Sequence, residues 1–235
     1  MSTESLNFVT VCTDRYPMVY AAILTERLRQ LSALSIEPYC LTDRPEETEG
    51  WATPLPQFVK ADGWWNKVNL FSPDMPAGTW LYLDLDIVLV QKFDDELRWI
   101  IDNMDALAAV SDPIQWMDEK FSSSMMLFKA HQHTHVFDAF EAQSTELKDR
   151  PGGDQVWMGP QLGEVLYIDE TFPSLKRNLK FHIAQKKGNT LDLPLTIPPD
   201  IKMVDCTGEP KPHQLEQLPY IKANWHDVLA AMQQA

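Results

Sequence analysis

An apolar run of eleven residues, WLYLDLDIVLV from Trp80 to Val90, contains two aspartates, Asp84 and Asp86. The run has the composition of a buried strand, in which successive side chains alternate between the two faces. Both carboxylates are therefore expected on one face, about 6–7 Å apart. Burying one carboxylate in a dry interior has an idealised upper bound of about 20 kcal/mol, and a second like charge adds repulsion. The fold must therefore end the strand in a cleft or place a cation between the carboxylates.

A divalent cation would suit such a pair. Mg²⁺ or Mn²⁺ takes one or two carboxylates and completes its shell with water and phosphate oxygens. The simpler alternative is that the two aspartates cap a turn or a helix, and for an isolated D-x-D motif this alternative is preferable. The position of the motif at the end of an apolar run favours the cation.

Net charge and cysteine content exclude several classes of protein. The 235 residues carry a formal net charge of −14, whereas a general nucleic-acid-binding protein needs a basic surface to neutralise phosphates. A small phosphate ligand held through a metal remains compatible with this charge. Cysteines 12, 40 and 206 are far apart and form no C-x-x-C pair, so neither a disulfide framework nor a zinc site is expected.

The N-terminal segment MSTESLNFVTV lacks the basic start and long apolar run of a secretion signal. No segment reaches the roughly 18 consecutive apolar residues of a membrane-spanning helix. We therefore expect no transmembrane segment and a cytoplasmic location in reducing conditions, with a peripheral position at the inner membrane face as the alternative.

The order of predicted elements indicates an α/β fold. Residues 6–14 read as a strand, the segment after Pro17 as a helix, and residues 36–43 as a second strand, which is the start of a parallel sheet. Further helices are predicted at 64–73, 94–104, 135–147, after the Gly-Pro break at 150–159, and at 223–232. Further strands are predicted at 105–112, 121–130 and 164–169. The Pro-rich segment 193–213 is predicted to be irregular.

Polar residues end three of the predicted strands. They are Thr13 and Asp14, Thr42 and Asp43, and the D-x-D pair. In open α/β sheets, ligands lie beyond the carboxyl ends of the strands. The three polar ends therefore predict one cleft.

The ordered motifs resemble those of nucleotide-sugar glycosyltransferases of the GT-A fold. They are WNKVNLF, YLDLDIVLV, FSSSMMLFK, GDQVWM and a late TGEPKPH, and the match spans roughly residues 8 to 213. The nearest in style are bacterial enzymes of the glycogenin and galactosyltransferase-like group, family 8-like. The resemblance implies a single domain, 1–235, with a Rossmann-like, mixed but mostly parallel sheet flanked by helices. Residues 1–110 would form the nucleotide-binding half, and residues 111–235 the sugar and acceptor half.

The resemblance also implies a metal-dependent hexosyltransferase with a UDP-sugar donor and a donor site of eleven residues. They are Thr13, Asp14, Tyr16, Lys67, Asp84, Asp86, Ser123, Ser124, Asp154, Gln155 and Lys211. The first three would contact base and ribose, and the two lysines would lie near the diphosphate. The D-x-D pair would hold Mn²⁺ or Mg²⁺, and the serines would line the sugar and acceptor site. Asp154 and Gln155 would reach the donor sugar and are the catalytic candidates. The acceptor would be a saccharide, a glycolipid or a protein.

One position departs from the family pattern. Relatives usually read F-H-G-K-P-K-P, with the histidine as third metal ligand, whereas this chain reads Cys206-Thr207-Gly208-Glu209-Pro210-Lys211-Pro212. Either the metal is held more loosely, Asp205 or His213 substitutes, or metal dependence is lost. Because of this departure, the alternative that the protein is a non-catalytic relative that only binds a nucleotide-sugar stays open. A D-x-D phosphatase is disfavoured, because its nucleophile follows the first strand.

Simpler interpretations stand beside several of these residues. Asp154 follows two glycines and could cap a helix, and Lys67 could be an exposed helix lysine. His131, His133 and His135 are expected to form a solvated cluster without a metal, since residues two apart do not share a helix face. The basic residues Lys176, Arg177, Lys180, Lys186 and Lys187 are expected in a solvated loop, with anionic lipid or a phosphorylated acceptor as the alternative. Trp64, Trp65 and Trp116 are candidates for stacking on sugar rings.

Overall fold

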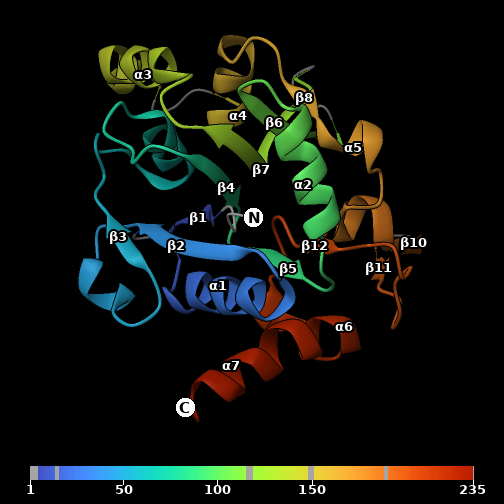
Figure 1. The fold of residues 1–235 in the computed structure, drawn as a ribbon. Coiled ribbons are helices and arrows are strands. Elements are labelled where there is room, and N and C mark those ends of the chain that lie inside the picture. Colours follow the sequence, from blue (N-terminus) through green and yellow to red (C-terminus); the bar gives the residue numbers. More distant parts are fainter. Residues whose placement is uncertain (1–4, 14–15, 115–118, 148–150, 188–189, 235) are drawn as a thin grey trace.

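The first strand, β1 (Ser5–Val11), lies inside a seven-stranded sheet with the strand order β3-β2-β1-β4-β7-β6-β8 (Figure 1). The computed structural model describes residues 5–13, 16–114, 119–147, 151–187 and 190–234. The other strands of this sheet are β2 (Ser35–Leu41), β3 (Thr53–Leu55), β4 (Thr79–Leu83), β6 (Leu107–Ser111), β7 (Phe121–Lys129) and β8 (Leu166–Tyr167). From β3 to β4 neighbouring strands are parallel, β7 is antiparallel to both β4 and β6, and β8 is parallel to β6. The predicted mixed, mostly parallel sheet is confirmed.

The helical segments include α-, 3-10 and π-helices, of which the last two carry the label η. They are α1 (Val19–Leu31), η1 (Pro45–Thr48), η2 (Gly63–Phe71), α2 (Asp94–Asn103), α3 (Thr134–Leu147), α4 (Gly153–Met158), η4 (Gly159–Gln161), α5 (Ile168–Thr171), η5 (Leu179–Ile183), η6 (Pro212–Gln214), α6 (Pro219–Ile221), η7 (Lys222–His226) and α7 (Asp227–Met232). The predicted helices are therefore present, with 64–73 forming a 3-10 helix. None of the described helices combines the length and hydrophobicity needed to cross a membrane.

Strand alternation sorts the core onto the two faces of the sheet. On β4, Trp80 and Tyr82 pack with residues of η2, α3 and α4. Leu81 and Leu83 point the other way and pack with residues of α1 and α2. Because both faces are covered, β4 is buried and mainly apolar from Trp80 to Leu83, as is typical of central strands in α/β proteins.

The apolar run that contains the D-x-D motif is two strands and not one. β4 ends at Leu83, and after three intervening residues β5 (Ile87–Leu89) begins in a different sheet. The prediction of one strand over 80–90 is therefore wrong, because the two aspartates occupy the turn that carries the chain from one sheet to the other. The sequence requires either that the strand ends in a cleft or that a cation lies between the two carboxylates, and β4 does end in a cleft.

The second sheet has three strands, β5, β12 (Met203–Asp205) and β9 (Lys176–Asn178). β12 lies between the others, antiparallel to β5 and parallel to β9. The prediction that 193–213 is irregular is wrong for β12, because a three-residue strand among prolines is too short to show a period. A separate hairpin joins β10 (Gln185–Lys187) and β11 (Thr190–Asp192).

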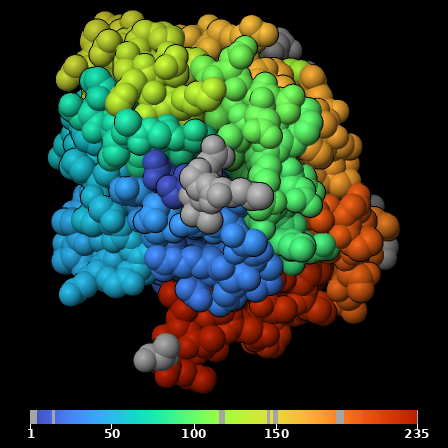
Figure 2. Space-filling view, in the orientation of Figure 1, coloured from blue at the N-terminus to red at the C-terminus, as the bar shows by residue number. Residues whose placement is uncertain are grey.

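The C-terminal helices lie against the first helix. α7 contacts α1, and Figures 1 and 2 show the red C-terminal segment beneath the blue α1. Tyr20 of α1, Trp225 of η7 and Val204 of β12 share one buried cluster. This cluster fixes the second sheet and the loop after it beside the first strand, at the D-x-D turn.

Candidate active site

The D-x-D turn is held by backbone hydrogen bonds from three sides. The Asp84 N–H donates to the carbonyl of Ser124 on β7 at 2.9 Å, and the Asp84 carbonyl accepts from the Ile87 N–H at 3.1 Å. The Asp86 carbonyl accepts from the Cys206 N–H at 3.0 Å. The turn is thus tied to the large sheet at one end and to the loop after β12 at the other.

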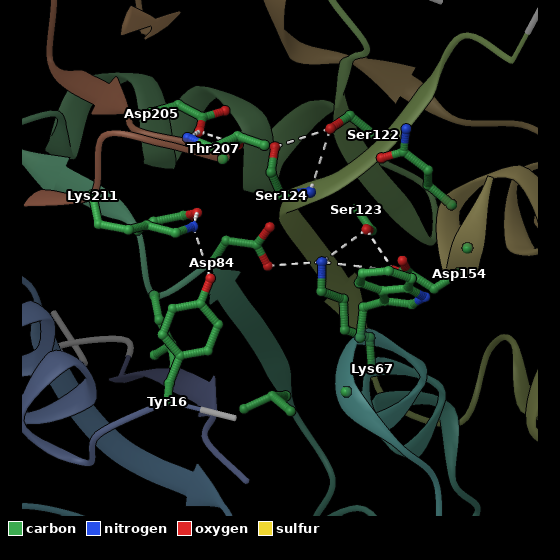
Figure 3. A pocket seen from close by; sticks show the side chains of 18 of the residues that line it. Tyr16, Lys67, Asp84, Ser122, Ser123, Ser124, Asp154, Asp205, Thr207 and Lys211 are labelled. Atoms are coloured by element: carbon green, nitrogen blue, oxygen red, sulfur yellow. Dashed lines mark hydrogen bonds and ion pairs between the residues drawn. The ribbon is translucent and has the colours of Figure 1, made fainter. Parts of the chain in front are cut away.

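Asp84 belongs to a buried network centred on Lys67 (Figure 3). The Lys67 Nζ lies 2.8 Å from Asp84 Oδ1 and 3.6 Å from Asp154 Oδ2, and it donates to Ser123 Oγ at 3.0 Å. The Ser123 hydroxyl donates to Asp154 Oδ2 at 2.7 Å, and the Tyr82 hydroxyl donates to Asp84 Oδ1. A single ammonium therefore joins two carboxylates that come from distant parts of the chain.

Burial and charge act against each other in this network. Burial by itself would lower the pKa of Lys67, but the carboxylates of Asp154 and Asp84 outweigh burial and raise this pKa above its ordinary value. Burial raises the pKa of Asp154, and Lys67 and the Ser123 hydroxyl oppose that rise. Burial and the neighbouring Asp84 raise the pKa of Tyr82. Lys67 therefore carries a proton at neutral pH, and Tyr82 remains a neutral donor.

Asp86 has a different lysine as its partner. The Lys211 Nζ donates to Asp86 Oδ2 at 2.7 Å. It also donates to the Tyr16 hydroxyl at 2.8 Å (Figure 3). Lys211 immediately precedes η6, on the loop that follows β12. Burial would lower the pKa of Lys211, but Asp86 outweighs burial and raises it. The two carboxylates of the D-x-D motif are therefore paired with two separate ammonium groups.

A third carboxylate, Asp205 at the end of β12, lies close behind Asp86. Its Oδ2 accepts from Lys176 Nζ at 2.6 Å, and its Oδ1 accepts from the Thr207 N–H at 2.9 Å and from the Thr207 hydroxyl. Burial would raise the pKa of Asp205, but Lys176 and Thr207 lower it. Burial, followed by the charges of Asp205 and Asp84, raises the pKa of Asp86 to about 6, although Lys211 opposes the rise.

These groups line a cavity of about 1270 Å³. Its polar wall includes the D-x-D pair, and its rim includes three of the exposed large hydrophobic residues of the described chain. They are Trp64, Ile114 and Phe181, whose exposed fractions are 49%, 48% and 50%. An ideal Cβ on Gly153, where φ is +65°, would come within 2.8 Å of the Trp64 Nε1. Glycine at 153 therefore lets the indole lie directly beside the start of α4 and Asp154.

The structure brings the described members of the predicted donor site to this cavity. Ten of the eleven residues are lining residues, namely Thr13, Tyr16, Lys67, Asp84, Asp86, Ser123, Ser124, Asp154, Gln155 and Lys211. Asp14 lies outside the described residues. The Gln155 amide donates to Asp112 Oδ2, and the Ser124 hydroxyl is 2.9 Å from that of Ser122. The functions of these residues remain predictions.

The simpler interpretations of Asp154 and Lys67 are wrong. The N-cap position of α4 is Gly152, and the Asp154 side chain instead contacts Ser123 and Lys67. Lys67 is buried and not exposed on its helix. The predicted cleft also needs one correction, since Thr42 and Asp43 are not among its lining residues. The Asp43 carboxylate contacts Arg44 instead, at 3.5 Å.

The secondary candidates also need correction. His133 is buried and not solvated, and Lys176 forms a buried pair with Asp205 and does not lie in a solvated loop. Trp65 is buried against Phe140 and Trp157, so only Trp64 of the described tryptophan candidates reaches the cavity. Trp116 lies outside the described residues.

Sequence reasoning missed several residues of the site. They are Tyr82, Asp112, Ser122, Asn178, Lys176, Glu209 and Trp225. Tyr82 carried a signal, since it lies two residues before Asp84 in the apolar run, a spacing that places two side chains on the same face of an extended segment. A register shift between β6 and β7, between Ala109 and Val110, accompanies the three consecutive cavity-lining serines on β7. No period in the sequence marks such a shift.

The donor set suits a divalent cation that draws further ligands from outside the protein. Asp84 and Asp86 supply two carboxylates, the number with which Mg²⁺ is usually held beside water and phosphate oxygens. Within the described residues, no three His, Cys, Asp or Glu side chains are placed to hold a metal on their own. Both substitutes for the missing histidine have other partners, because Asp205 binds Lys176 and Thr207 and the His213 Nδ1 contacts the Tyr20 hydroxyl.

No protein-family model and no curated protein sequence matches this chain. Solved structures do match. The galactosyltransferase LgtC in complex with donor and acceptor sugar analogs superposes with a TM-score of 0.65 at 15% identity, over 96% of this chain and 95% of that chain. The glycosyltransferase GlyE of Streptococcus pneumoniae TIGR4 gives 0.64 at 14% identity, over 96% of this chain and 63% of that chain. Mouse xyloside xylosyltransferase 1 gives 0.52 at 12% identity, over 87% and 98%.

At these identities the similarity establishes the fold. The structural neighbours are glycosyltransferases, and their arrangement of strands and helices extends over nearly all of this chain. The resemblance drawn from the ordered motifs is therefore confirmed at the level of architecture: the chain has the GT-A fold of these glycosyltransferases.

Proposed function

We propose that this protein transfers a sugar from a nucleoside diphosphate donor, most simply a UDP-sugar, to an acceptor. The observation that carries the proposal is the convergence of two Asp–Lys pairs, Asp84 with Lys67 and Asp86 with Lys211, on one cavity that also contains Asp154. Its volume of about 1270 Å³ exceeds the roughly 300–1,000 Å³ typical of small-molecule pockets. A nucleotide-sugar and part of an acceptor could occupy it together.

The chemistry needs positive charge where the diphosphate leaves and a directed polar group at the sugar. Lys67 and Lys211, both protonated at neutral pH, would stabilise the charge that develops on the departing phosphates. Asp154, fixed by Ser123 and Lys67, would orient the sugar hydroxyls or steady positive character at the anomeric carbon. Ser123 and Ser124 would line the sugar and acceptor side, and Thr13 and Tyr16 the nucleoside side.

Asp84 and Asp86 are proposed to hold the divalent cation, Mg²⁺ or Mn²⁺. When bound, such an ion supplies Lewis-acid stabilisation of the leaving diphosphate. The protein's own part is to present two carboxylates on a fixed turn, next to Lys67 and to Lys211, of which Lys211 can turn onto a phosphate oxygen. Gln155, held by Asp112, would fix the start of α4 and with it the direction of Asp154.

We also propose which groups of the site each half of the chain contributes. Residues 1–110 contribute the D-x-D turn and Lys67, and residues 111–235 contribute Ser123, Asp154 and Lys211. The resemblance implies that the two halves form one domain, with the nucleotide mainly on the first and the sugar and acceptor mainly on the second.

The test is a panel of nucleotide-sugars incubated with the protein and Mg²⁺ or Mn²⁺, with release of the nucleoside diphosphate as the readout. A transferase consumes at least one donor, and Asp154→Asn lowers the turnover of that donor about 100-fold or more, the usual effect of losing a preorganised polar group. Asp138→Asn, a change on α3 away from the residues lining the cavity, serves as the control.

The Thr207 substitution favours one alternative, a relative that binds the nucleotide-sugar without turning it over. Calorimetry separates the two functions. UDP binding without consumption of any UDP-sugar would favour the non-catalytic relative, whereas no binding of UDP or any other nucleoside diphosphate would overturn both.

A further inference from the structure

The cavity has more acidic than basic groups. Its described lining includes the carboxylates of Asp84, Asp86, Asp112, Asp154, Asp205 and Glu209 but the ammonium groups of only Lys67 and Lys211. A diphosphate is itself strongly negative, so an acidic cavity binds it poorly unless further positive charge arrives. The inference drawn here rests on the proposed function and concerns how that charge enters.

Lys211 occupies the position that a cation on Asp86 would need. Its ammonium lies 2.7 Å from Asp86 Oδ2, which is the distance of a strong charge-assisted hydrogen bond. The lysine lies on a loop between β12 and η6, and its side chain lines the cavity. Its flexible four-carbon stem lets the ammonium reach more than one nearby anion.

Thr207 stands in the place of the family's third metal ligand, and its side chain already has another partner. Thr207 turns both its hydroxyl and its N–H to Asp205, and Asp205 is in turn neutralised by Lys176. A cation at the D-x-D turn therefore has to obtain its remaining ligands from water and from phosphate oxygens. Without a phosphate ligand it has to compete with Lys211 for Asp86 and with Lys67 for Asp84.

We propose that Lys211 is the counter-ion of Asp86 in the nucleotide-free protein and that a divalent cation enters only together with the diphosphate. On entry of this pair, the cation takes Asp86 and the Lys211 ammonium turns to a phosphate oxygen. Cation and nucleotide then raise each other's affinity by the same factor, as linkage requires. The lysine acts as a competitor of the cation before binding and as a ligand of the phosphates afterwards.

The decisive variant is Lys211→Met, and the probe is Mn²⁺ alone, with free Mn²⁺ followed by electron paramagnetic resonance. The proposal predicts weak Mn²⁺ binding by the nucleotide-free wild type and binding at least about tenfold tighter by Lys211→Met, within the usual range of coupling between sites. UDP affinity, measured by calorimetry, falls in the same variant. In the wild type, UDP tightens Mn²⁺ binding by a similar factor.

Two matched variants separate displacement from a general charge effect. Lys180→Met also removes a positive charge near this loop, since the Lys180 ammonium lies against Gly208, but it leaves Asp86 paired with Lys211. It should therefore leave Mn²⁺ binding nearly unchanged. Lys211→Arg keeps the charge and should behave like the wild type, and Lys211→Gln repeats the test should the methionine variant fail to fold.

The proposal is overturned if Lys211→Met binds Mn²⁺ no better than the wild type, or if Lys180→Met gains as much as Lys211→Met. It is also overturned if UDP binds the wild type without changing its Mn²⁺ affinity, a result that leaves the proposed function standing. A protein that binds no nucleoside diphosphate at all contradicts the proposed function, and the Mn²⁺ comparison without nucleotide still tests whether Lys211 is the counter-ion.

Discussion

The two aspartates of one D-x-D motif lie in different environments. Asp84 joins a buried network built on the large sheet. Lys67 and Tyr82 contact Asp84 directly, and Ser123 contacts both Lys67 and Asp154. Asp86, two residues later, faces a single lysine from a loop that follows the small sheet. The first end is a rigid network of mutually dependent groups, whereas the second holds an exchangeable partner.

The difference shows how one turn can serve two purposes. The Lys67 ammonium cannot leave without removing the counter-charge from two carboxylates at once, of which Asp154 is buried, so the Asp84 end fixes geometry. Lys211 pairs with one carboxylate only and lies on the loop before η6, so the Asp86 end suits a ligand that comes and goes.

The largest expected effect is on stability. Lys67→Met leaves the buried carboxylate of Asp154 and the partly buried carboxylate of Asp84 without a counter-charge, which should reduce the free energy of unfolding by about 3–5 kcal/mol. Lys211→Met should reduce it by a smaller amount, because it leaves one carboxylate, Asp86, without its ammonium partner instead of two. Urea denaturation of both variants measures the difference.

Lys222→Met is the control for these two variants, since it removes an exposed lysine whose partner Asp227 is also exposed. Its free energy of unfolding should hardly change, because exposed ion pairs contribute little. Equal losses in Lys67→Met and Lys211→Met would contradict the contrast between the two ends.

An intermediate effect is expected from two neighbouring serines. Ser123→Ala removes a donor to Asp154 and an acceptor for Lys67, at a cost of about 1–3 kcal/mol because charged, buried groups lose a partner. Ser124→Ala breaks only a contact between two hydroxyls and should cost less. Thermal unfolding of the pair measures both, and a larger loss in Ser124→Ala would show that the Asp84 network does not depend on Ser123.

The smallest expected effect lies outside both ends, at the buried His133. Burial, followed by the charge of His135, lowers the pKa of His133, and its Nε2 has no hydrogen-bond partner among the described residues. The unfolded chain therefore binds more protons than the folded one as the pH falls through the ordinary histidine range, and stability is lost on the acidic side.

His133→Phe should reduce this loss, because the phenyl ring can pack against Phe71 as the imidazole does and cannot take up a proton. The measurement is the midpoint of unfolding for wild type and variant between pH 7.5 and 5.5. If the midpoint of unfolding falls equally with pH in the wild type and the variant, His133 is not the group responsible for the loss of stability in acid.

Much of the architecture could be predicted because its signals are local. The apolar, β-branched composition of 6–14, the Thr-Asp ending of 36–43, the helical spacing after Pro17 and the apolar strand before Asp84 each depend on residues close together in the chain. The ordered motifs then identified the fold, and the described members of the predicted donor site do line one cavity. In each case a short segment carries its own period or its own polar ending.

The partners of the charged residues could not be predicted, because they are set by contacts between distant segments. Asp84 meets Lys67 only because η2 packs beside β4. Asp86 meets Lys211 only because β12 pairs with β5 and brings the loop that follows β12 to the turn. The break of the apolar run into two strands of two sheets likewise depends on β12, which is too short to be recognised on its own. The fold and the chemical groups of the cleft follow from patterns along the chain, whereas the pairing of each ammonium with its carboxylate depends on where distant strands come together in space.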